Sequence, residues 1–266
     1  MHAHADSEAP AQDAVDARDP RRAPWRGLPS AIRFLTIVPI PGAAGTELAV
    51  AASWFPVVGA AVGAFAGGVR VGAQQLLGRT PATVLAMIAL VVVTGALHQD
   101  GLADTADGLG ARGDRSRRLQ VMRDSATGVF GTLALIGWAL LLLTTLASLD
   151  ASHALIALVV ACALARWAAL VHATVTPPAH TDGLGAALHV GPIALGLATT
   201  TSLVLALALC GLTPGAIALV AVLLVVALST TFARRTLGGR TGDTLGATVA
   251  ITEIAVCAAL LAVWHG

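Results

Sequence analysis

The sequence predicts an all-α, polytopic integral membrane protein, a helix bundle with about seven transmembrane helices, and two observations carry this prediction. Of the 266 residues, 56% are hydrophobic and 12% are charged, and the mean hydropathy is +0.80. Several apolar runs also approach or exceed the roughly 20 residues that span a bilayer. This composition excludes an ordinary soluble domain.

The apolar runs predict seven spans, at roughly 48–69, 81–98, 129–149, 152–175, 191–210, 214–232 and 247–265. The first contains Gly59, Gly63 and Gly67, a four-residue spacing that lets two helices approach closely in lipid. Residues 30–41 are apolar but too short to span, and Pro39 and Pro41 close them. They predict an interfacial or re-entrant helix.

The polar segments divide the chain simply. Residues 1–29 are rich in Ala, Asp, Arg and Pro and lack the apolar core of a signal peptide, so they predict a disordered tail. Since no later polar stretch is long enough to fold alone, residues 30–266 are expected to form a single membrane domain. The three cysteines lie in or beside apolar runs without a CxxC pair, which argues against a disulfide framework or a zinc site.

The distribution of arginine among the loops predicts the orientation of the chain in the membrane. The chain has no lysine, so all 16 positive charges are arginine. With a cytoplasmic N-terminus, the inside loops (1–47, 99–128, 176–190 and 233–246) hold 13 arginines. The outside loops hold Arg70 and Arg79, and Arg166 lies within a span. This bias follows the positive-inside rule. We therefore expect a multi-pass protein of the cytoplasmic (inner) membrane whose polar motifs all face the cytoplasm.

The segment 98–131 places a cluster of aspartates and arginines between two apolar runs, at a predicted membrane boundary. Asp100, Asp104 and Asp107 are spaced i, i+4, i+7, so they share one face if the helix of the second span continues through Leu109. Three carboxylates on one face favour a bound divalent cation, and Mg²⁺ prefers carboxylate and phosphate oxygens. Gly101 and Gly108 are expected to leave room for a substrate.

Arginines follow these aspartates. Arg112 and Arg123 are candidates for bidentate phosphate binding, whereas the charges between them serve equally well as membrane anchors. Asp124 and Ser125 continue the motif into the third span. This combination of residues indicates chemistry on a phosphorylated substrate.

A second polar motif, RTLGGRTGDTLG, precedes the last span. Its glycines, among them Gly239 and Gly242, surround Arg240 and Asp243 and could present backbone N–H groups to phosphate.

Two charges fall inside predicted spans. Arg166 and Glu253 are costly there, so we expect both to be functional, with Arg166 binding substrate or pairing with a motif aspartate. His98 and His172 are at least as consistent with structural roles.

The stretches RFLTIVPIP, HQDGLADTADG, MRDSATGVFG and RTLGGRTGDTLGA, followed by Glu253, together resemble the adenosylcobinamide-GDP ribazoletransferase (cobalamin synthase) family. They occur in the family's order, and the resemblance covers essentially the whole chain beyond the tail. The sequence departs at Ala250, where many relatives are expected to carry an acidic residue, and mildly at Gln99.

The resemblance implies a Mg²⁺-dependent membrane enzyme that joins adenosylcobinamide-GDP to α-ribazole or its 5′-phosphate and releases GMP. Its expected partners are the two substrates and the lipid bilayer, together with other cobalamin-assembly enzymes and without nucleic acid. The metal ligands expected are Asp100, Asp104, Asp107 and Glu253. The catalytic residues expected are Asp104, Asp107, Asp124 and Asp243, and the substrate-binding residues are Arg112, Arg123, Arg166, Arg240, Gly239, Gly242 and Ser125.

Two other functions are weighed against this one. Residues 104–112 fit the opening of the CDP-alcohol phosphotransferase signature, but Val121, Ser125 and Val129 break its second half. A lipid-synthesis enzyme is therefore the runner-up. A transporter predicts polar residues dispersed through the spans and internal repeats, whereas the charges here cluster at one membrane face.

Overall fold

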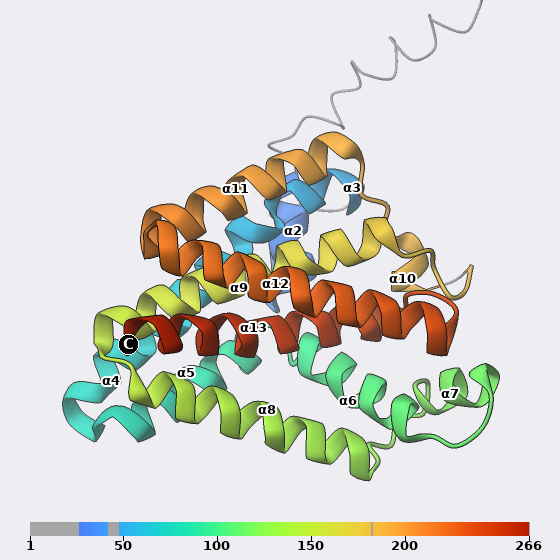
Figure 1. Cartoon of the computed structure of the whole chain (residues 1–266), viewed down its shortest axis with the longest axis horizontal. Coiled ribbons are helices and arrows are strands. Elements are labelled where there is room, and N and C mark those ends of the chain that lie inside the picture. Colours follow the sequence, from blue (N-terminus) through green and yellow to red (C-terminus); the bar gives the residue numbers. More distant parts are fainter. Residues whose placement is uncertain (1–26, 42–47, 182, 266) are drawn as a thin grey trace, which may run out of the picture.

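The computed structural model describes residues 27–41, 48–181 and 183–265. Within these ranges the chain is helical and forms no sheet (Figure 1). The elements in chain order are α2 (Gly27–Leu35), α3 (Leu48–Ala51), η3 (Ala52–Trp54), α4 (Phe55–Leu77), α5 (Arg79–Val93), α6 (Leu97–Gly110), α7 (Arg115–Val121), α8 (Val129–Ser148), α9 (Ala151–Val175), α10 (Leu184–Ala187), α11 (Pro192–Cys210), α12 (Leu212–Phe232), η4 (Ala233–Leu237) and α13 (Gly242–Trp264).

Six helices in the described residues are long and apolar enough to cross a membrane, which confirms the predicted polytopic bundle. They are Leu48–Leu77, Val129–Ser148, Ala151–Val175, Pro192–Cys210, Leu212–Leu237 and Gly242–Trp264. The predicted tail falls largely outside the described residues, although positions 27–29 already belong to α2.

The second predicted span, 81–98, is wrong as a single straight helix. The chain breaks after Val93, and α5 and α6 meet at an angle of 88°. Gly95 and Ala96 adopt left-handed backbone conformations, with φ of 60° and 59°. A continuous apolar run therefore contains a turn, and α6, which carries the first aspartate motif, is a separate helix.

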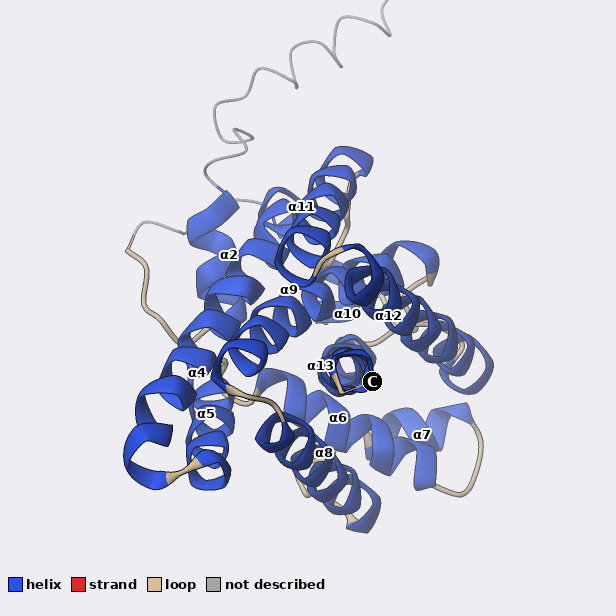
Figure 2. Cartoon of the chain, turned by 60° about the vertical axis from the view of Figure 1, so that its left-hand side comes forward, coloured by secondary structure: helices blue, strands red, loops and turns tan. Residues whose placement is uncertain are grey.

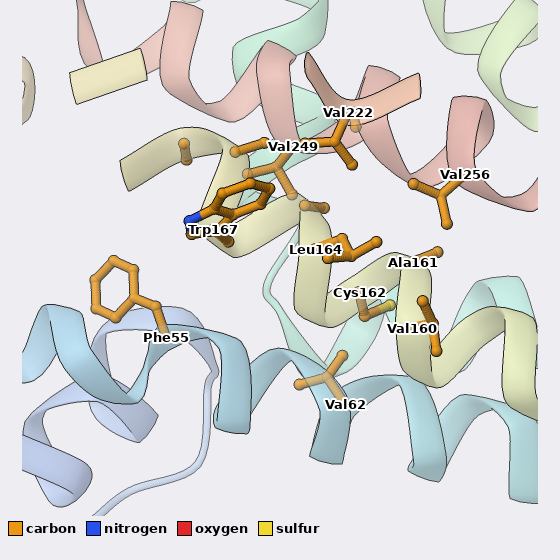
Figure 3. Packing of buried hydrophobic residues seen from close by; sticks show 14 of the residues in the cluster. Phe55, Val62, Val160, Ala161, Cys162, Leu164, Trp167, Val222, Val249 and Val256 are labelled. Carbon is orange, nitrogen blue, oxygen red and sulfur yellow. The ribbon is translucent and has the colours of Figure 1, made fainter. Parts of the chain in front are cut away.

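The centre of the bundle is α13, which contacts α6, α8, α9 and α12. Figure 2 shows α13 nearly end-on, with these helices around it. Next to it, α9 is buried along most of its length and carries Cys162, Leu164 and Trp167 into the core. Figure 3 shows this helix between α4, at Val62, and α13, at Val249 and Val256.

The glycines of α4 explain how closely it packs on α9. A Cβ atom at Gly59 or Gly63 would collide with the backbone carbonyl of Cys162 or Leu158. Gly67 faces the side chain of Leu155, which a Cβ there would also meet. The close helix approach predicted from the glycine spacing is confirmed.

The sequence predicts that Arg70 lies in an outside loop, and this prediction is wrong. Because α4 continues to Leu77, Arg70 lies within the helix and is completely buried. Its guanidinium donates hydrogen bonds to the carbonyls of Leu146 (2.9 Å) and Leu149 (2.7 Å) and to Thr83 Oγ1 (3.1 Å). Arg70 thereby ties α4 and α5 to the end of α8, where the final carbonyls of a helix need partners from outside it.

The predicted helix at 30–41 is present but shorter and shifted, since α2 ends at Leu35. The Phe34 ring stacks on Phe55 of α4, with centroids 5.5 Å apart. Downstream, the Ile37 N–H bonds the Val93 carbonyl at 2.9 Å, at the break between α5 and α6. The segment thus packs on the bundle beside the first aspartate motif.

The polar loops gather at one end of the bundle, beside α7, α10 and the start of α13 (Figure 1). Arg115 at the start of α7 donates to the Ala179 carbonyl at 2.7 Å. Parallel backbone pairing joins Pro178 to Arg240. The two motifs that are remote in sequence are therefore neighbours, as a shared membrane face requires.

Candidate active site

The three aspartates of α6 share a face, as their spacing predicts, but they lie in different environments. Asp100 is exposed, Asp104 is half-buried and Asp107 is buried. Burial therefore increases along α6, from Asp100 at the surface to Asp107 in the packing between α6 and α8. These three residues are therefore not equivalent in what they can bind.

Asp107 is fully engaged with the start of α8. Its carboxylate accepts hydrogen bonds from the backbone N–H groups of Gly128 (2.7 Å) and Gly131 (2.8 Å). A carboxylate at this end of a helix satisfies free N–H groups and complements the helix dipole. A Cβ at either glycine would collide with the same carboxylate. The geometry gives Asp107 a positioning role, and its predicted role as a metal ligand stays a prediction.

Asp100 and Asp104 instead face the first turn of α13. Asp104 interacts electrostatically with Asp100, Asp243 and Asp107, and Asp243 interacts with Asp100. The helices meet at Gly101, where a Cβ would lie 2.7 Å from the Asp243 carbonyl oxygen. The prediction that Gly101 leaves room for a substrate is wrong, because α13 occupies that space. The glycine instead brings three carboxylates from two distant motifs together.

Among the described residues, no group of three or more His, Cys, Asp or Glu side chains is already placed to hold a metal ion. The four predicted ligands do not form a ready-made cage. Mg²⁺ does not require one, since it is usually held by one or two carboxylates together with substrate phosphates and water. The hard oxygen donors of Asp100, Asp104 and Asp243 match that requirement in type.

Glu253 forms an ion pair with Arg166 in the bundle interior, where the side chains are 2% and 1% exposed. The predicted pairing of Arg166 with a motif aspartate is therefore wrong, and a role of Glu253 as a metal ligand stays a prediction. Arg166 also donates to the Cys162 carbonyl at 3.3 Å and lies 3.5 Å from His98 Nδ1. A charge pair at this depth compensates two side chains that would each be costly alone.

The glycine-rich motif before α13 packs tightly on the loop that follows α9. A Cβ at Gly239 would clash with the backbone of Pro177 and Ala179, and the Arg240 N–H bonds the Pro177 carbonyl at 2.8 Å. The Arg240 guanidinium is buried and donates to the carbonyls of Thr176 and Leu188. Arg240 therefore fixes the two loops against each other, and binding of phosphate by its remaining edge stays a prediction.

The first turn of α13 is well ordered by its own sequence. Thr241 and Thr244 form a reciprocal capping box, in which each side chain bonds the backbone N–H of the other. Thr241 Oγ1 also donates to Asp243 at 3.4 Å. The carboxylate of Asp243 is thus held at a helix N-terminus, facing α6.

Two cavities share this turn as part of their lining. One, of about 240 Å³, is the more polar of the two, with Arg123, His180, Arg240 and Thr241 in its wall beside apolar side chains. The other, of about 250 Å³, is mainly apolar and extends to Arg166 and His98. Gly242 and Asp243 line both cavities. Asp243 therefore lies at the boundary between the two cavities, and Asp100 of α6 lines the apolar one.

The remaining predicted residues lie around this centre. Arg112, Asp124 and Ser125 are exposed in the segment between α6 and α8. Asp124 accepts a hydrogen bond from the Ala126 N–H and is not among the carboxylates that interact with Asp104. Its catalytic role stays a prediction. Asp114 caps α7, and hydrogen bonds from the Arg117 N–H and the Ser116 hydroxyl hold its pKa below the usual range.

Sequence reasoning missed His180, which lines the polar cavity and interacts electrostatically with Asp243. Its position in a Pro- and Gly-rich loop indicated only turns. Phe34 and Phe55, which line the apolar cavity, were also missed. Their apolar context makes them indistinguishable in sequence from ordinary core residues.

Comparison with known proteins identifies the family to which the sequence is related. The sequence profile of the cobalamin-5-phosphate synthase family matches residues 27–261. A protein from Desulforamulus reducens named adenosylcobinamide-GDP ribazoletransferase is 40% identical over 221 residues, covering 82% of this chain and 88% of its own length. Proteins of the same name from Azorhizobium caulinodans and a Roseiflexus species are 37% and 38% identical, over 85% and 94% of this chain and 91% and 95% of their own lengths.

No solved structure gives a significant match to the chain. The profile covers the aspartate motif, the glycine-rich motif and the buried ion pair alike. On this extent of similarity, the chain belongs to the cobalamin-5-phosphate synthase family.

Proposed function

We propose that the protein transfers the phosphocobinamide group of adenosylcobinamide-GDP to α-ribazole or its 5′-phosphate, with release of GMP and with Mg²⁺ as cofactor. One observation carries the proposal beyond family membership. Asp243 lies where the polar and apolar cavities share their lining, Asp100 lines the apolar cavity, and Asp104 interacts electrostatically with both carboxylates. A transferase with two dissimilar substrates needs such a boundary.

The reaction itself requires little covalent chemistry from the protein. A ribose hydroxyl of ribazole attacks the phosphorus nearer the cobinamide, the bridging P–O bond of the pyrophosphate breaks, and GMP leaves with that oxygen. The hydroxyl proton must be accepted as the new bond forms. Asp243 is the best-placed acceptor, because the capping box holds it at the boundary between the two cavities.

The polar cavity suits the nucleotide half of adenosylcobinamide-GDP. Arg123 and His180 line it together with the first turn of α13. The Arg123 guanidinium and a helix N-terminus favour a diphosphate in this position. Asp100 and Asp104 would hold Mg²⁺, which supplies charge neutralisation on the pyrophosphate oxygens when bound.

The same reasoning orients the protein. The arginine bias of the loops supports a cytoplasmic position for the site, in a multi-pass protein of the inner membrane. Water-soluble nucleotide substrates would then reach the polar cavity from the cytoplasm. Reporter fusions after Gly110 and Gly242 should both indicate the cytoplasm, and an external location of either would contradict this orientation.

The activity test uses the purified full chain in liposomes with adenosylcobinamide-GDP, α-ribazole and Mg²⁺. We expect GMP and a corrinoid product in equal amounts, and loss of both on chelation of the metal. Parallel incubation with CDP-diacylglycerol and an alcohol acceptor addresses the lipid-synthesis alternative. Turnover of that pair, without GMP release from the corrinoid, would reject the proposal.

Two substitutions test the site. Asp104→Asn and Asp243→Asn should each lower turnover at least 100-fold, the scale of one acid–base or charge-stabilising group. The matched control is Asp114→Asn on the exposed cap of α7, which should retain activity. Full activity in both site variants would show that the carboxylates at the cavity boundary are not the catalytic centre.

A further inference from the structure

The apolar cavity has a composition unlike that of the polar cavity beside it. Phe34, Phe55, Leu188 and Val249 contribute apolar wall, and most of the lining surface is apolar. The Phe34 and Phe55 rings are stacked within 14° of parallel. A cavity of this kind, with aromatic walls and a few polar groups, is typical of a site for a small flat ligand.

The polar groups of the cavity are few and directional. Arg166 lines it from α9 and His98 lines it from α6. Arg166 is held in place by Glu253 and by the Cys162 carbonyl, while its Nε has no hydrogen-bond partner. A buried N–H without a partner is costly. A ligand with one acceptor atom at this depth would satisfy a donor that is otherwise orphaned.

Another part of the lining carries Asp100 and Asp243. Asp243 also lines the polar cavity, and Asp100 is exposed. A molecule that fits both parts needs an apolar aromatic end with one acceptor, and a hydroxylated end that reaches the carboxylates. A nucleoside with an apolar base has this chemistry.

We propose that the cavity binds the dimethylbenzimidazole base of ribazole, with its unsubstituted ring nitrogen accepting a hydrogen bond from Arg166 and its ribose at Asp100 and Asp243. This assignment rests on the proposed function. The base is flat and apolar and has one free acceptor nitrogen. Guanine, with its carbonyl, amine and ring N–H groups, would leave several polar atoms unpaired against this wall. The corrin ring is far too large for about 250 Å³.

The binding test compares two probes that differ by one atom. These are 1,5,6-trimethylbenzimidazole, which keeps the acceptor nitrogen, and 1,5,6-trimethylindole, which has C–H in its place. With the full chain in nanodiscs, we expect the benzimidazole to bind at least tenfold more tightly and to compete with α-ribazole. Equal affinity of the two probes would indicate an unspecific apolar or lipid site and would overturn the proposal.

A cavity-filling variant gives an independent reading in the activity assay. Ala169 lines the cavity, so Ala169→Leu should raise the KM for α-ribazole at least tenfold and leave the KM for adenosylcobinamide-GDP unchanged. The matched control is Ala139→Leu, which fills a separate apolar cavity between α5 and α8 and should change neither KM. A change confined to adenosylcobinamide-GDP would overturn the assignment.

The two proposals fail in different ways. GMP release with equal binding of the two probes would reject the base site and leave the reaction intact. Discrimination between the probes without any GMP release would reject the reaction, while the cavity would stand as a site for an acceptor-bearing aromatic ring.

Discussion

The ion pair between Arg166 and Glu253 should dominate the stability of the bundle core. Both side chains are almost completely buried, between α9 and α13. Removing one partner leaves an uncompensated charge, which costs about 3–5 kcal/mol in a protein interior. For a chain of this size that corresponds to a fall in Tm of about 6–20 °C. We therefore expect Glu253→Gln and Arg166→Met each to lower the Tm by this amount.

The double variant Arg166→Met/Glu253→Gln decides whether the loss comes from the unpaired charge. It contains neither charge, so it should melt above both single variants. Thr252→Val is the matched control, because Thr252 is fully buried next to Glu253 but bonds its own helix at the Thr248 carbonyl. We expect its Tm to fall by only a few degrees.

The chain carries its own reporter for this measurement. Cys162 and Cys257 are buried, so a thiol-reactive fluorophore added to the detergent-solubilised protein reads their exposure as the bundle unfolds. Single variants that melt with the wild type would refute the reasoning. So would a double variant whose loss equals the sum of the two single losses, because the charges would then be energetically independent.

Three further changes probe packing by the same melting assay. Gly63→Ala should lower the free energy of unfolding by about 1–3 kcal/mol, because the added Cβ meets the α9 backbone. Gly68→Ala is the control, since Gly68 has open space on the same helix. Equal losses in the two variants would disprove the close approach of the helices. Gly131→Ala should likewise destabilise α8 by about 1–3 kcal/mol through the Asp107 carboxylate, with Gly137→Ala as the harmless comparison. Arg70→Met should cost about 2–3 kcal/mol by removing its bonds to the end of α8, and an unchanged Tm would show that these bonds contribute nothing net.

The sequence was sufficient for most of the fold, because membrane spans are encoded locally in apolar length. It failed at 81–98, where hydropathy is continuous although the helix breaks. The sequence offers Gly95 as a hint, but the left-handed conformation of Ala96 beside it has no counterpart in composition. The tight packing of α4 on α9 was predictable, since glycines at four-residue spacing have a direct steric meaning.

The site was predictable as a set of residues and less so as a set of contacts. Helical periodicity placed the aspartates of α6 on one face. It could not show that α13 lies against Gly101 and brings Asp243 to them, because that contact joins segments more than a hundred residues apart. The pairing of Arg166 with Glu253 is non-local for the same reason, and no local pattern distinguishes it from pairing with a motif aspartate.

The aspartates of α6 show why residue type and spacing do not determine a role. Asp107 is bonded through both oxygens to the start of α8, and it therefore orders the segment between α7 and α8 whether or not a metal is bound. Asp104, one turn earlier, interacts with carboxylates on both helices. Such repulsion costs free energy in the absence of a cation or phosphate-bound metal to offset it. Identical side chains three residues apart thus have different surroundings, and loss of activity in an Asp107 variant would be evidence about the position of α8 before it was evidence about the metal.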